Sequence, residues 1–340
     1  MSIDVHAHLY PPSYMSFVNT LAHDTSVAAE AIQATIHDPL IAQVPAFQNA
    51  LDERIIMMDK AGIDIQILSL AGYNIWHPDP VVRSDIVRVF NDSCTEAIKS
   101  YSDRFLLFAN VPLPFVDRAI AEATRAFDEL GAVGIGVCTH FAGLPIDHVQ
   151  FEPFYQFMNE RKGIISFHPD GFSVPHFLDD YGMEWGIGAL FDDTIVLIRL
   201  IYSGLLERFP NITWLVPHLA GTLPFLIDRL DDMWRWFPPS LGNLSQPPSS
   251  YLRHPNLYID TITTQCSALT LAREIFGADR LVLGSDFPYV SREDLSLGTR
   301  LLQEANFSSS EIEQVLSSNI ASKLGLATTR ISDEEIAPEG

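Results

Sequence analysis

Two histidines near the N-terminus, His6 and His8, have the spacing of a metal-binding pair. They follow a short β-branched run, and side chains two positions apart in a β-strand project to the same face. Both imidazoles would therefore point in one direction. A His-x-His pair alone is weak evidence for a metal, because histidines at strand ends also hydrogen-bond to loop carbonyls. The pair needs partners from other parts of the chain.

Three further residues of metal-binding or acid–base type, His168, His218 and Asp286, each follow an apolar run that predicts a strand. In a parallel barrel the carboxyl ends of all strands crowd one rim, so residues far apart in sequence meet there. Taken singly, each histidine is explained equally well as a buried residue bonded to a carbonyl, and Asp286 as a helix N-cap. Five such residues at strand ends favour a single site.

The elements that must position these residues alternate between short β-branched runs and longer stretches of helical periodicity. This alternation predicts an α/β fold, a (β/α)8 TIM barrel. A doubly wound open sheet is the alternative, but it normally carries a Gly-rich phosphate turn after its first strand, and none is present here. The predicted strands are residues 3–5, 63–69, 105–110, 133–137, 164–167, 212–216, 257–260 and 281–283. The predicted helices are residues 51–61, 81–101, 119–130, 152–161, 194–208, 223–236, 269–276 and 292–305.

Two insertions interrupt this alternation, residues 9–50 after the first strand and residues 169–193 after the fifth strand. Loops that follow barrel strands build the active face, so we expect both insertions to wall or cover the site. Residues 1–326 are predicted to form one barrel domain, closed by one or two helices within 308–326. Residues 327–340 are polar and acidic, and we expect them to form a disordered tail.

The charge of the chain excludes some classes of partner. Forty-three acidic and 21 basic residues give a formal net charge of −22, which repels phosphate backbones and anionic membrane surfaces. We therefore expect neither a nucleic acid nor a membrane as partner. The same field repels an anionic substrate, so a carboxylate ligand would need a local cation, either a metal ion or a buried arginine.

The three cysteines, Cys94, Cys138 and Cys266, lie in apolar or helical stretches without disulfide or metal-clip spacing. They indicate free thiols in a reducing compartment. The sequence shows neither the basic and apolar regions of a secretory leader nor an apolar run of roughly 18 residues. We expect a cytoplasmic protein.

The order of the site residues resembles that of the amidohydrolase superfamily, which has His-x-His after strand one, histidines after strands five and six, and an aspartate after strand eight. Within it, the finer motifs resemble the aminocarboxymuconate-semialdehyde decarboxylase branch, which includes isoorotate, γ-resorcylate and 6-methylsalicylate decarboxylases. The resemblance spans residues 3 to about 326. The matching stretches are residues 6–14, 54–64, 168–169, 203–210, 218–225 and 284–288.

The resemblance implies that one divalent metal is held by His6, His8, His168 and Asp286. Two-metal members carry a carboxylated lysine or a glutamate after strand four, where this chain has Cys138 and its neighbours. Imidazole and carboxylate ligands without a thiolate suit Zn²⁺ or Mn²⁺. We expect Zn²⁺, with Mn²⁺ as the alternative. The open coordination positions would take a substrate carboxylate and an adjacent hydroxyl or oxo group.

Loss of CO₂ from an aromatic acid requires protonation of the ring carbon first, because a free aryl anion is too high in energy. The resemblance implies that Asp286 is the catalytic acid and that His218 orients the substrate or relays the proton. The expected enzyme is a carbon–carbon lyase, a carboxy-lyase that needs no cofactor besides the metal. Its substrate would be a small aromatic or unsaturated carboxylic acid of the 6-methylsalicylate or 5-carboxyuracil type.

Substrate-binding residues are predicted from the same resemblance and from their places after strands. Arg54 matches a family arginine that reaches the substrate carboxylate or a ring oxygen, and a surface salt bridge is the alternative. Four aromatic residues follow strand ends and would wall a flat substrate, although each is also an ordinary core or lid residue. They are Trp76, Phe172, Phe191 and Phe287.

Two departures from the family pattern narrow the substrate. A family asparagine that reads the substrate after strand two is replaced by Gly72 in the run from Ser69 to Trp76, which disfavours a pyrimidine. Both histidines of His-x-His are kept, whereas some phenolic-acid members have glutamate first, which disfavours γ-resorcylate.

The residues also allow other functions. A hydrolase of a lactone or amide would use the same metal, with Asp286 as base instead of acid. A barrel that only stores metal is a third possibility. These barrels commonly form homodimers or homotetramers, and residues 233–237 offer an apolar contact patch.

Overall fold

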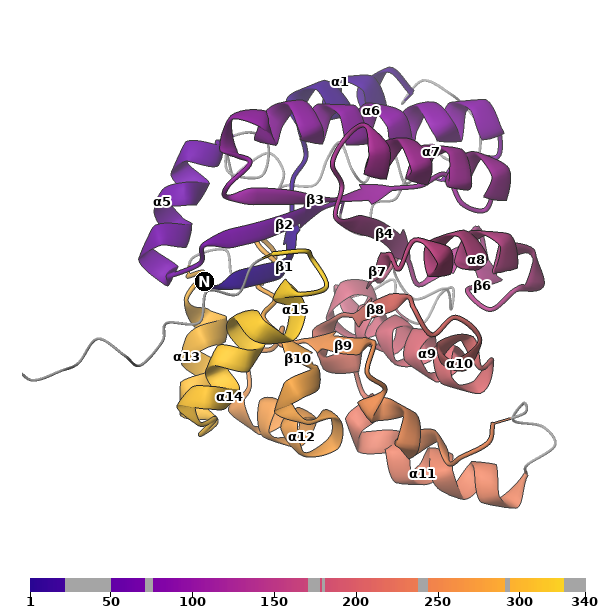
Figure 1. Cartoon of the computed structure of the whole chain (residues 1–340), viewed down its shortest axis with the longest axis vertical. Coiled ribbons are helices and arrows are strands. Elements are labelled where there is room, and N and C mark those ends of the chain that lie inside the picture. The colour runs from indigo at the N-terminus through magenta and orange to yellow at the C-terminus, as the bar shows by residue number, and fades with distance from the viewer. Residues whose placement is uncertain are drawn as a thin grey trace, which may run out of the picture.

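Eight parallel strands follow one another around a barrel in the computed structural model, which describes residues 1–21, 50–70, 76–170, 178, 181–237, 244–290 and 294–326. Each strand pairs with the next parallel strand along the chain (Figure 1), so successive strands are joined by crossover connections. The strands are β1 (Ile3–His8), β2 (Ile65–Ser69), β3 (Phe105–Asn110), β4 (Gly134–Cys138), β7 (Ile164–His168), β8 (Thr213–Val216), β9 (Leu257–Asp260) and β10 (Leu281–Val282).

Backbone hydrogen bonds between β1 and the segment at the end of β10 close the barrel. The amide of Val5 donates to the carbonyl of Leu283 at 2.9 Å. Further along, the amide of Asp286 donates to the carbonyl of His6, and the amide of His8 to that of Phe287, both at 2.9 Å. The predicted (β/α)8 fold is confirmed, and the predicted strands coincide with the observed ones to within a few residues.

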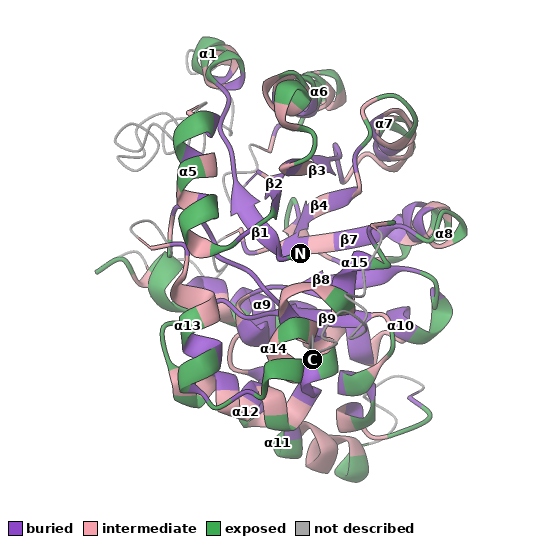
Figure 2. Ribbon diagram, turned by 60° about the vertical axis from the view of Figure 1, so that its left-hand side comes forward, coloured by how far each residue is buried: buried purple, intermediate pink, exposed green. Residues whose placement is uncertain are grey.

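Helices surround the strands, with their buried faces toward the barrel and their exposed faces outward (Figure 2). The α-helices are α1 (Pro12–Leu21), α5 (Leu51–Ala61), α6 (Pro80–Ile98), α7 (Val116–Asp128), α8 (Glu152–Glu160), α9 (Ala189–Tyr202), α10 (Leu205–Arg208), α11 (Leu223–Trp236), α12 (Cys266–Phe276), α13 (Leu297–Glu304), α14 (Ser309–Glu313) and α15 (Asn319–Ala321). Short 3-10 or π-helical turns are η1 (Lys99–Tyr101), η2 (Val149–Phe151), η3 (Glu184–Gly188), η4 (His218–Ala220), η6 (Pro248–Arg253), η7 (Ala278–Arg280) and η8 (Gln314–Ser318).

The core has two parts, one inside the barrel and one between barrel and helices. Inward-pointing residues such as Phe108, Ile164 and Leu215 fill the barrel. Ile320 and Leu324 from the C-terminal segment pack against the same cluster. A larger apolar cluster lies between the outer strand faces and the helices. The interior is therefore packed and largely apolar, and the histidines and Asp286 gather at the carboxyl ends of the strands.

A β-bulge in β1 decides which residues of that strand face the interior. Between Asp4 and Ala7 three steps along β1 match only two steps along β2, so β1 carries one extra residue. Ile3 and Val5 belong to the inner cluster, and strict alternation would place Ala7 there next. Instead Ala7 belongs to the outer cluster, and the bulge turns the histidines on either side of it inward.

The two predicted insertions are described in part. The first begins with α1, and residues 22–49 lie outside the described part of the chain. The second ends in η3 and the start of α9. The sequence did not predict the antiparallel pair β5 (His140–Phe141) and β6 (Leu144–Pro145) between β4 and α8. The expected tail, residues 327–340, lies outside the described residues. No helix in the described ranges is long and apolar enough to cross a membrane.

One buried amide side chain joins α6 to the end of β3. Asn91 is fully buried, and its Nδ2 donates to the carbonyl of Asn110 at 3.0 Å. Its Oδ1 accepts from the amide nitrogen of Asn110 at 2.8 Å. Both backbone groups of Asn110 would lose their partner if this side chain were removed.

We predict that Asn91→Ala lowers the free energy of unfolding by about 2–4 kcal/mol, since two buried backbone groups would be left without hydrogen bonds. Urea unfolding followed by circular dichroism measures the change. The control is Asn159→Ala, which removes an exposed hydrogen bond to the amide of Asn211 and should cost less than about 1 kcal/mol. Equal losses in the two variants would contradict the assigned role of Asn91.

Candidate metal centre

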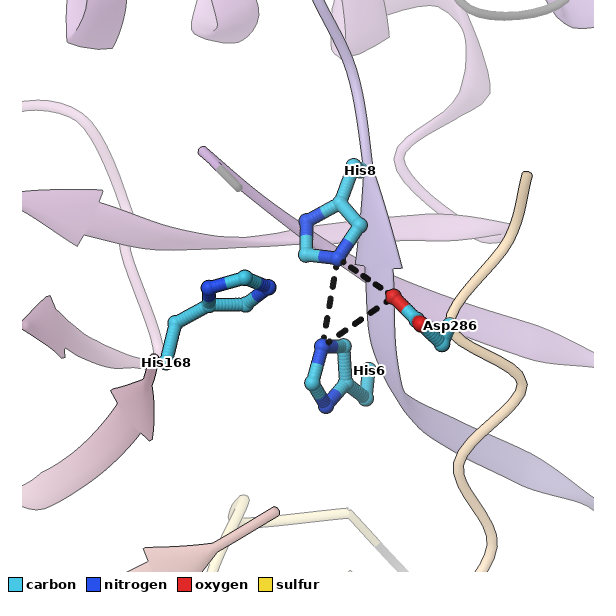
Figure 3. Close-up of side chains that lie close together, drawn as sticks. All are labelled: His6, His8, His168 and Asp286. Carbon is cyan, nitrogen blue, oxygen red and sulfur yellow. Dashed lines mark hydrogen bonds and ion pairs between the residues drawn. The ribbon is translucent and has the colours of Figure 1, made fainter. Parts of the chain in front are cut away.

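Four side chains from distant parts of the sequence converge at the carboxyl end of the barrel (Figure 3). His6 and His8 come from β1, His168 ends β7, and Asp286 follows β10. One potential ligand atom of each lies within 4.8 Å of those of the other three. The Nε2 atoms of His6 and His8 are 3.1 Å apart, and Nε2 of His8 is 3.0 Å from Oδ1 of Asp286. The structure thus brings together the four residues predicted as ligands.

Two of these imidazoles are oriented by a hydrogen bond at Nδ1, the ring nitrogen that faces away from the cluster. Nδ1 of His6 lies 2.8 Å from Oδ2 of Asp260, and Nδ1 of His168 lies 2.8 Å from the carbonyl oxygen of Pro169. The carbonyl of Pro169 only accepts, so Nδ1 of His168 carries the hydrogen. Burial raises the pKa of Asp260 to about 7, and in its ionised form this carboxylate also only accepts, so Nδ1 of His6 then carries the hydrogen. The lone pair of each ring is then on Nε2, the atom that faces the centre.

The donor set fits one divalent cation. The donor atoms of His6, His8 and Asp286 lie 3.0–3.6 Å apart, the spacing of neighbouring ligands that are each about 2.1 Å from a shared ion. The donor atom of His168 lies within 4.8 Å of each of them. Burial, with a further contribution from His8, lowers the pKa of His6 and of His168 well below the usual range, so both rings are neutral. Neutral imidazoles that turn their lone pairs toward one another need a cation between them. Imidazole and carboxylate together suit zinc-like and manganese-like ions.

His218 lies beside this set rather than within it. Its Nε2 is 3.6 Å from Oδ2 of Asp286, whose other oxygen faces the Nε2 atoms of His6 and His8. On its other side, Nδ1 of His218 lies 2.9 Å from Oδ2 of Asp193. Asp286 therefore stands between the ligand histidines and His218, with one carboxylate oxygen toward each.

The two members of the His218–Asp286 pair have shifted pKa values. Burial alone raises the pKa of Asp286, but its contacts with His218 and His8 outweigh burial and hold the pKa well below its usual range. Burial lowers the pKa of His218, yet Asp193 and Asp286 outweigh it and raise this pKa well above its usual range. In the protein the proton of the pair therefore resides on the imidazole.

A buried acid beneath the site ties the β1 bulge to the loop that carries Asp286. Oδ1 of Asp4 accepts from the amides of His6 at 3.1 Å and Ser285 at 3.0 Å. Its Oδ2 accepts from Nε2 of Gln66 at 2.8 Å. Burial raises the pKa of Asp4 to about 6, partly offset by these hydrogen bonds. The carboxylate therefore fixes the backbone at His6 and at Ser285, the residue before Asp286.

Sequence reasoning missed three buried acids of the site, Asp4, Asp193 and Asp260. Asp260 ends a predicted strand, as His168 does, so its position at the rim was available as a signal. Asp193 is the last residue of the second predicted insertion and follows another acid, Asp192, so its type and position did not distinguish it. Asp4 gave no signal, because the bulge that brings it under the site is set by pairing with β2.

Arg54 and Phe287, both predicted to contact the substrate, lie behind His8. Arg54 is fully buried, so it does not form a surface salt bridge, and its Nη2 donates to the carbonyl of His8 at 2.8 Å. Its guanidinium carbon lies 4.8 Å above the ring of the fully buried Phe287. Nδ1 of His8 is also 3.3 Å from Oγ of Ser69. Arg54 and Phe287 therefore lie behind His8 and support this predicted ligand.

The other aromatic residues that were predicted to wall the substrate lie on separate segments of the chain. Phe191 lies on α9 with 39% of its surface exposed, and Trp76 is partly buried before α6. Phe172 lies outside the described residues. None of the described aromatic residues that were predicted as walls lines the cavity next to the ligands.

That cavity, about 10 Å³ in volume, lies on the β2, β3, β4 and β7 side of the ligand set. It has room for about one water molecule. Apart from His6 and His168, the described lining residues include no Asp, Glu, Lys or Arg. The described lining residues are His6, Ser69, Leu70, Asn110, Gly136, Val137, Cys138, Ser166, Phe167 and His168.

Comparison with known proteins gives a family match over nearly the whole chain. The family described as Amidohydrolase matches residues 3–326. The chain belongs to the amidohydrolase family. Its position within that family is the aminocarboxymuconate-semialdehyde decarboxylase branch, as the sequence motifs indicated.

Relatives of this amidohydrolase include several decarboxylases. A 2-amino-3-carboxymuconate-6-semialdehyde decarboxylase from Dictyostelium discoideum is 23% identical over 96% of this chain and 92% of its own. A 6-methylsalicylic acid decarboxylase from Aspergillus aculeatus is 26% identical over 89% of each chain. A γ-resorcylate decarboxylase from a Rhizobium species is 30% identical over 70% of this chain and 76% of its own.

Solved structures share the fold of this amidohydrolase. The 5-carboxyvanillate decarboxylase from Sphingomonas paucimobilis superposes with a TM-score of 0.83 at 22% identity, covering 96% of this chain and 99% of that one. A dihydroxybenzoic acid decarboxylase from a Polaromonas species, with bound manganese and 2-nitroresorcinol, gives a TM-score of 0.76 at 21% identity, covering 95% and 96%.

The hydrogen bond from His6 to Asp260 leads to a prediction about metal affinity. We expect Asp260→Asn to weaken metal binding roughly 10–100-fold, because the imidazole loses the carboxylate that orients it and raises its basicity. Competition with a fluorescent chelator measures the affinity. Asp279→Asn, which neutralises an exposed carboxylate, is the matched control and should bind metal as the wild type does. Unchanged affinity in Asp260→Asn would refute the orienting role.

Proposed function

We propose that this amidohydrolase is a metal-dependent, non-oxidative decarboxylase, a carboxy-lyase that acts on a small aromatic or unsaturated carboxylic acid. The observation that carries the proposal is the match of nearly the whole chain to decarboxylases, together with the intact cluster that the residues of the shared motifs form. The same relatives support decarboxylation over hydrolysis of a lactone or amide.

One divalent ion would be held by His6, His8, His168 and Asp286. When bound, it supplies the positive charge that a substrate carboxylate and a neighbouring hydroxyl or oxo group need in a protein of net charge −22. We propose Zn²⁺ or Mn²⁺ as this ion. Manganese in the Polaromonas relative supports Mn²⁺, and the histidine-rich donor set supports Zn²⁺ equally well.

The proton for the reaction would come from the His218–Asp286 pair. His218 holds the proton 3.6 Å from Asp286, so it can pass to Oδ2 of Asp286 when a substrate lies against that carboxylate. Asp286 then protonates the ring carbon that bears the carboxylate. The bond from this carbon to the carboxylate breaks, CO₂ leaves, and the bonding electrons restore the aromatic ring. Water returns the proton to the pair.

The far side of the substrate would lie against Ser69, Asn110 and Cys138, which end β2, β3 and β4 and line the cavity. The side-chain amide of Asn110 has no hydrogen-bond partner among the described residues, while both of its backbone groups bond to the side chain of Asn91. A neutral polar group on the ring would satisfy it. Trp76 is proposed as a wall of this site, as are Phe172 and Phe191. Arg54 and Phe287 would act on the substrate through His8.

We also propose that the protein forms a homodimer or homotetramer in the cytoplasm. Phe225, Trp236 and Phe237 on and just after α11 are 84%, 64% and 52% exposed, which supports a contact surface near the predicted patch. The three cysteines are free thiols, which supports a reducing compartment.

The first experiment measures CO₂ release from the metal-loaded protein with 6-methylsalicylate, 5-carboxyuracil, 2,3- and 2,6-dihydroxybenzoate and several lactones. We expect CO₂ from at least one of the acids, and no activity in Asp286→Asn. His218→Asn should keep its metal and lose about 10²–10⁴-fold in kcat, because only the proton source is removed. Asp232→Asn, an exposed position, is the control. Acid formed from a lactone without CO₂ would show a hydrolase instead.

For an acid that carries a ring hydroxyl, we expect Asn110→Ala to lower kcat/KM about 3–10-fold, the effect of one lost neutral hydrogen bond. The same variant assayed with the analogue that lacks the hydroxyl is the internal control and should change little. Metal content, measured in parallel, should stay at the wild-type level. A uniform loss with both substrates would mean that Asn110 does not read a substituent.

A further inference from the structure

An acid on α9 is buried against His218. Asp193 is fully buried in α9, where its neighbours Asp192 and Thr194 are also buried and the following buried residues, Val196 and Leu197, are apolar. Its Oδ2 lies 2.9 Å from Nδ1 of His218, and its Oδ1 is buried with no hydrogen-bond partner among the described residues. A carboxylate in such surroundings costs stability unless it is paired, so the contact with His218 is its main compensation.

The same turn of α9 also holds the backbone after His218. Residues 218–221 all have positive φ, from 51° to 60°, in the left-handed region that non-glycine residues rarely adopt. Just beyond them, Oγ1 of Thr194 accepts from the amide of Thr222 at 2.8 Å. A Cβ on Gly221 would lie 1.9 Å from the carbonyl oxygen of Leu190, so only glycine fits there. The strained turn that presents His218 is thus built against α9.

The hydrogen bond also fixes which nitrogen of His218 carries the hydrogen. Oδ2 of Asp193 only accepts, so Nδ1 donates, and the neutral ring keeps its lone pair on Nε2. Nε2 is the atom that faces Asp286, at 3.6 Å. The backbone amide of His218 donates to Oδ1 of Asp260 at 2.8 Å, so both ends of the residue are held by buried carboxylates.

We infer that Asp193 is a positioning residue, which keeps His218 in the orientation and tautomer that let Nε2 exchange a proton with Asp286. This inference rests on the proposed proton step. Asp193 belongs neither to the ligand cluster nor to the lining of the cavity, and its side chain bonds to His218, so we expect it to act through His218. A buried aspartate that orients a catalytic imidazole typically contributes several powers of ten to a rate.

The kinetic test is Asp193→Asn, which keeps the size of the side chain. We expect kcat for CO₂ release to fall about 10²–10⁴-fold, while KM, metal content and the melting temperature change little, because only the carboxylate that selects the tautomer is lost. Asp192→Asn is the matched control, since Asp192 is the preceding residue and is also buried, whereas the carboxylate bonded to His218 is that of Asp193. An equal loss of kcat in both variants would reduce Asp193 to a structural role.

A second measurement does not depend on which reaction the protein catalyses. The imidazole nitrogens of ¹⁵N-histidine-labelled, Zn²⁺-loaded protein are recorded by NMR, and the His218 signals are assigned by their absence in His218→Gln. We expect a protonated Nδ1 in the wild type and a changed pattern in Asp193→Asn. His218 signals that are the same in both proteins would overturn the inference. A wild type without CO₂ release but with the expected signals would refute the decarboxylase alone.

Discussion

Everything at this site depends on the convergence of three imidazole lone pairs and one carboxylate on a single buried point. Such lone pairs repel one another unless a cation lies between them, so each ring must be held in place from behind. Asp260 holds His6, and the carbonyl of Pro169 holds His168. The outer partners are themselves buried, so the arrangement of ligands exists before any ion binds. The barrel provides that preorganisation through its closed, packed interior.

Strand order and the four residues of the ligand cluster were both predictable from the sequence, because each leaves a local pattern. A period of two in strands, helical periodicity between them, and His or Asp directly after a strand require no knowledge of pairing. The bulge in β1 is different. It places His6 and His8 inside the barrel because β1 has one extra residue relative to β2. The pairing of two strands cannot be predicted from the sequence of either strand alone.

Supporting residues were harder to predict than ligands for a related reason. Asp193 and Asp260 act through hydrogen bonds to imidazoles that lie 25 and 254 positions away. Arg54, predicted to reach the substrate, instead donates to a backbone carbonyl at His8, a partner that no side-chain pattern reveals. Residue type shows what a side chain can do, whereas its partner is decided by the packing of helices on the barrel.

The charges next to Asp286 favour proton donation over base catalysis. A divalent ion in the ligand cluster would carry two positive charges, and contacts with Asp193 and Asp286 raise the pKa of His218 well above its usual range. The proton of the His218–Asp286 pair is already present on the imidazole, so it is available to a ring carbon, whereas base catalysis by the same pair would first require its removal. The arrangement of charge at the ligand cluster therefore suits decarboxylation better than hydrolysis.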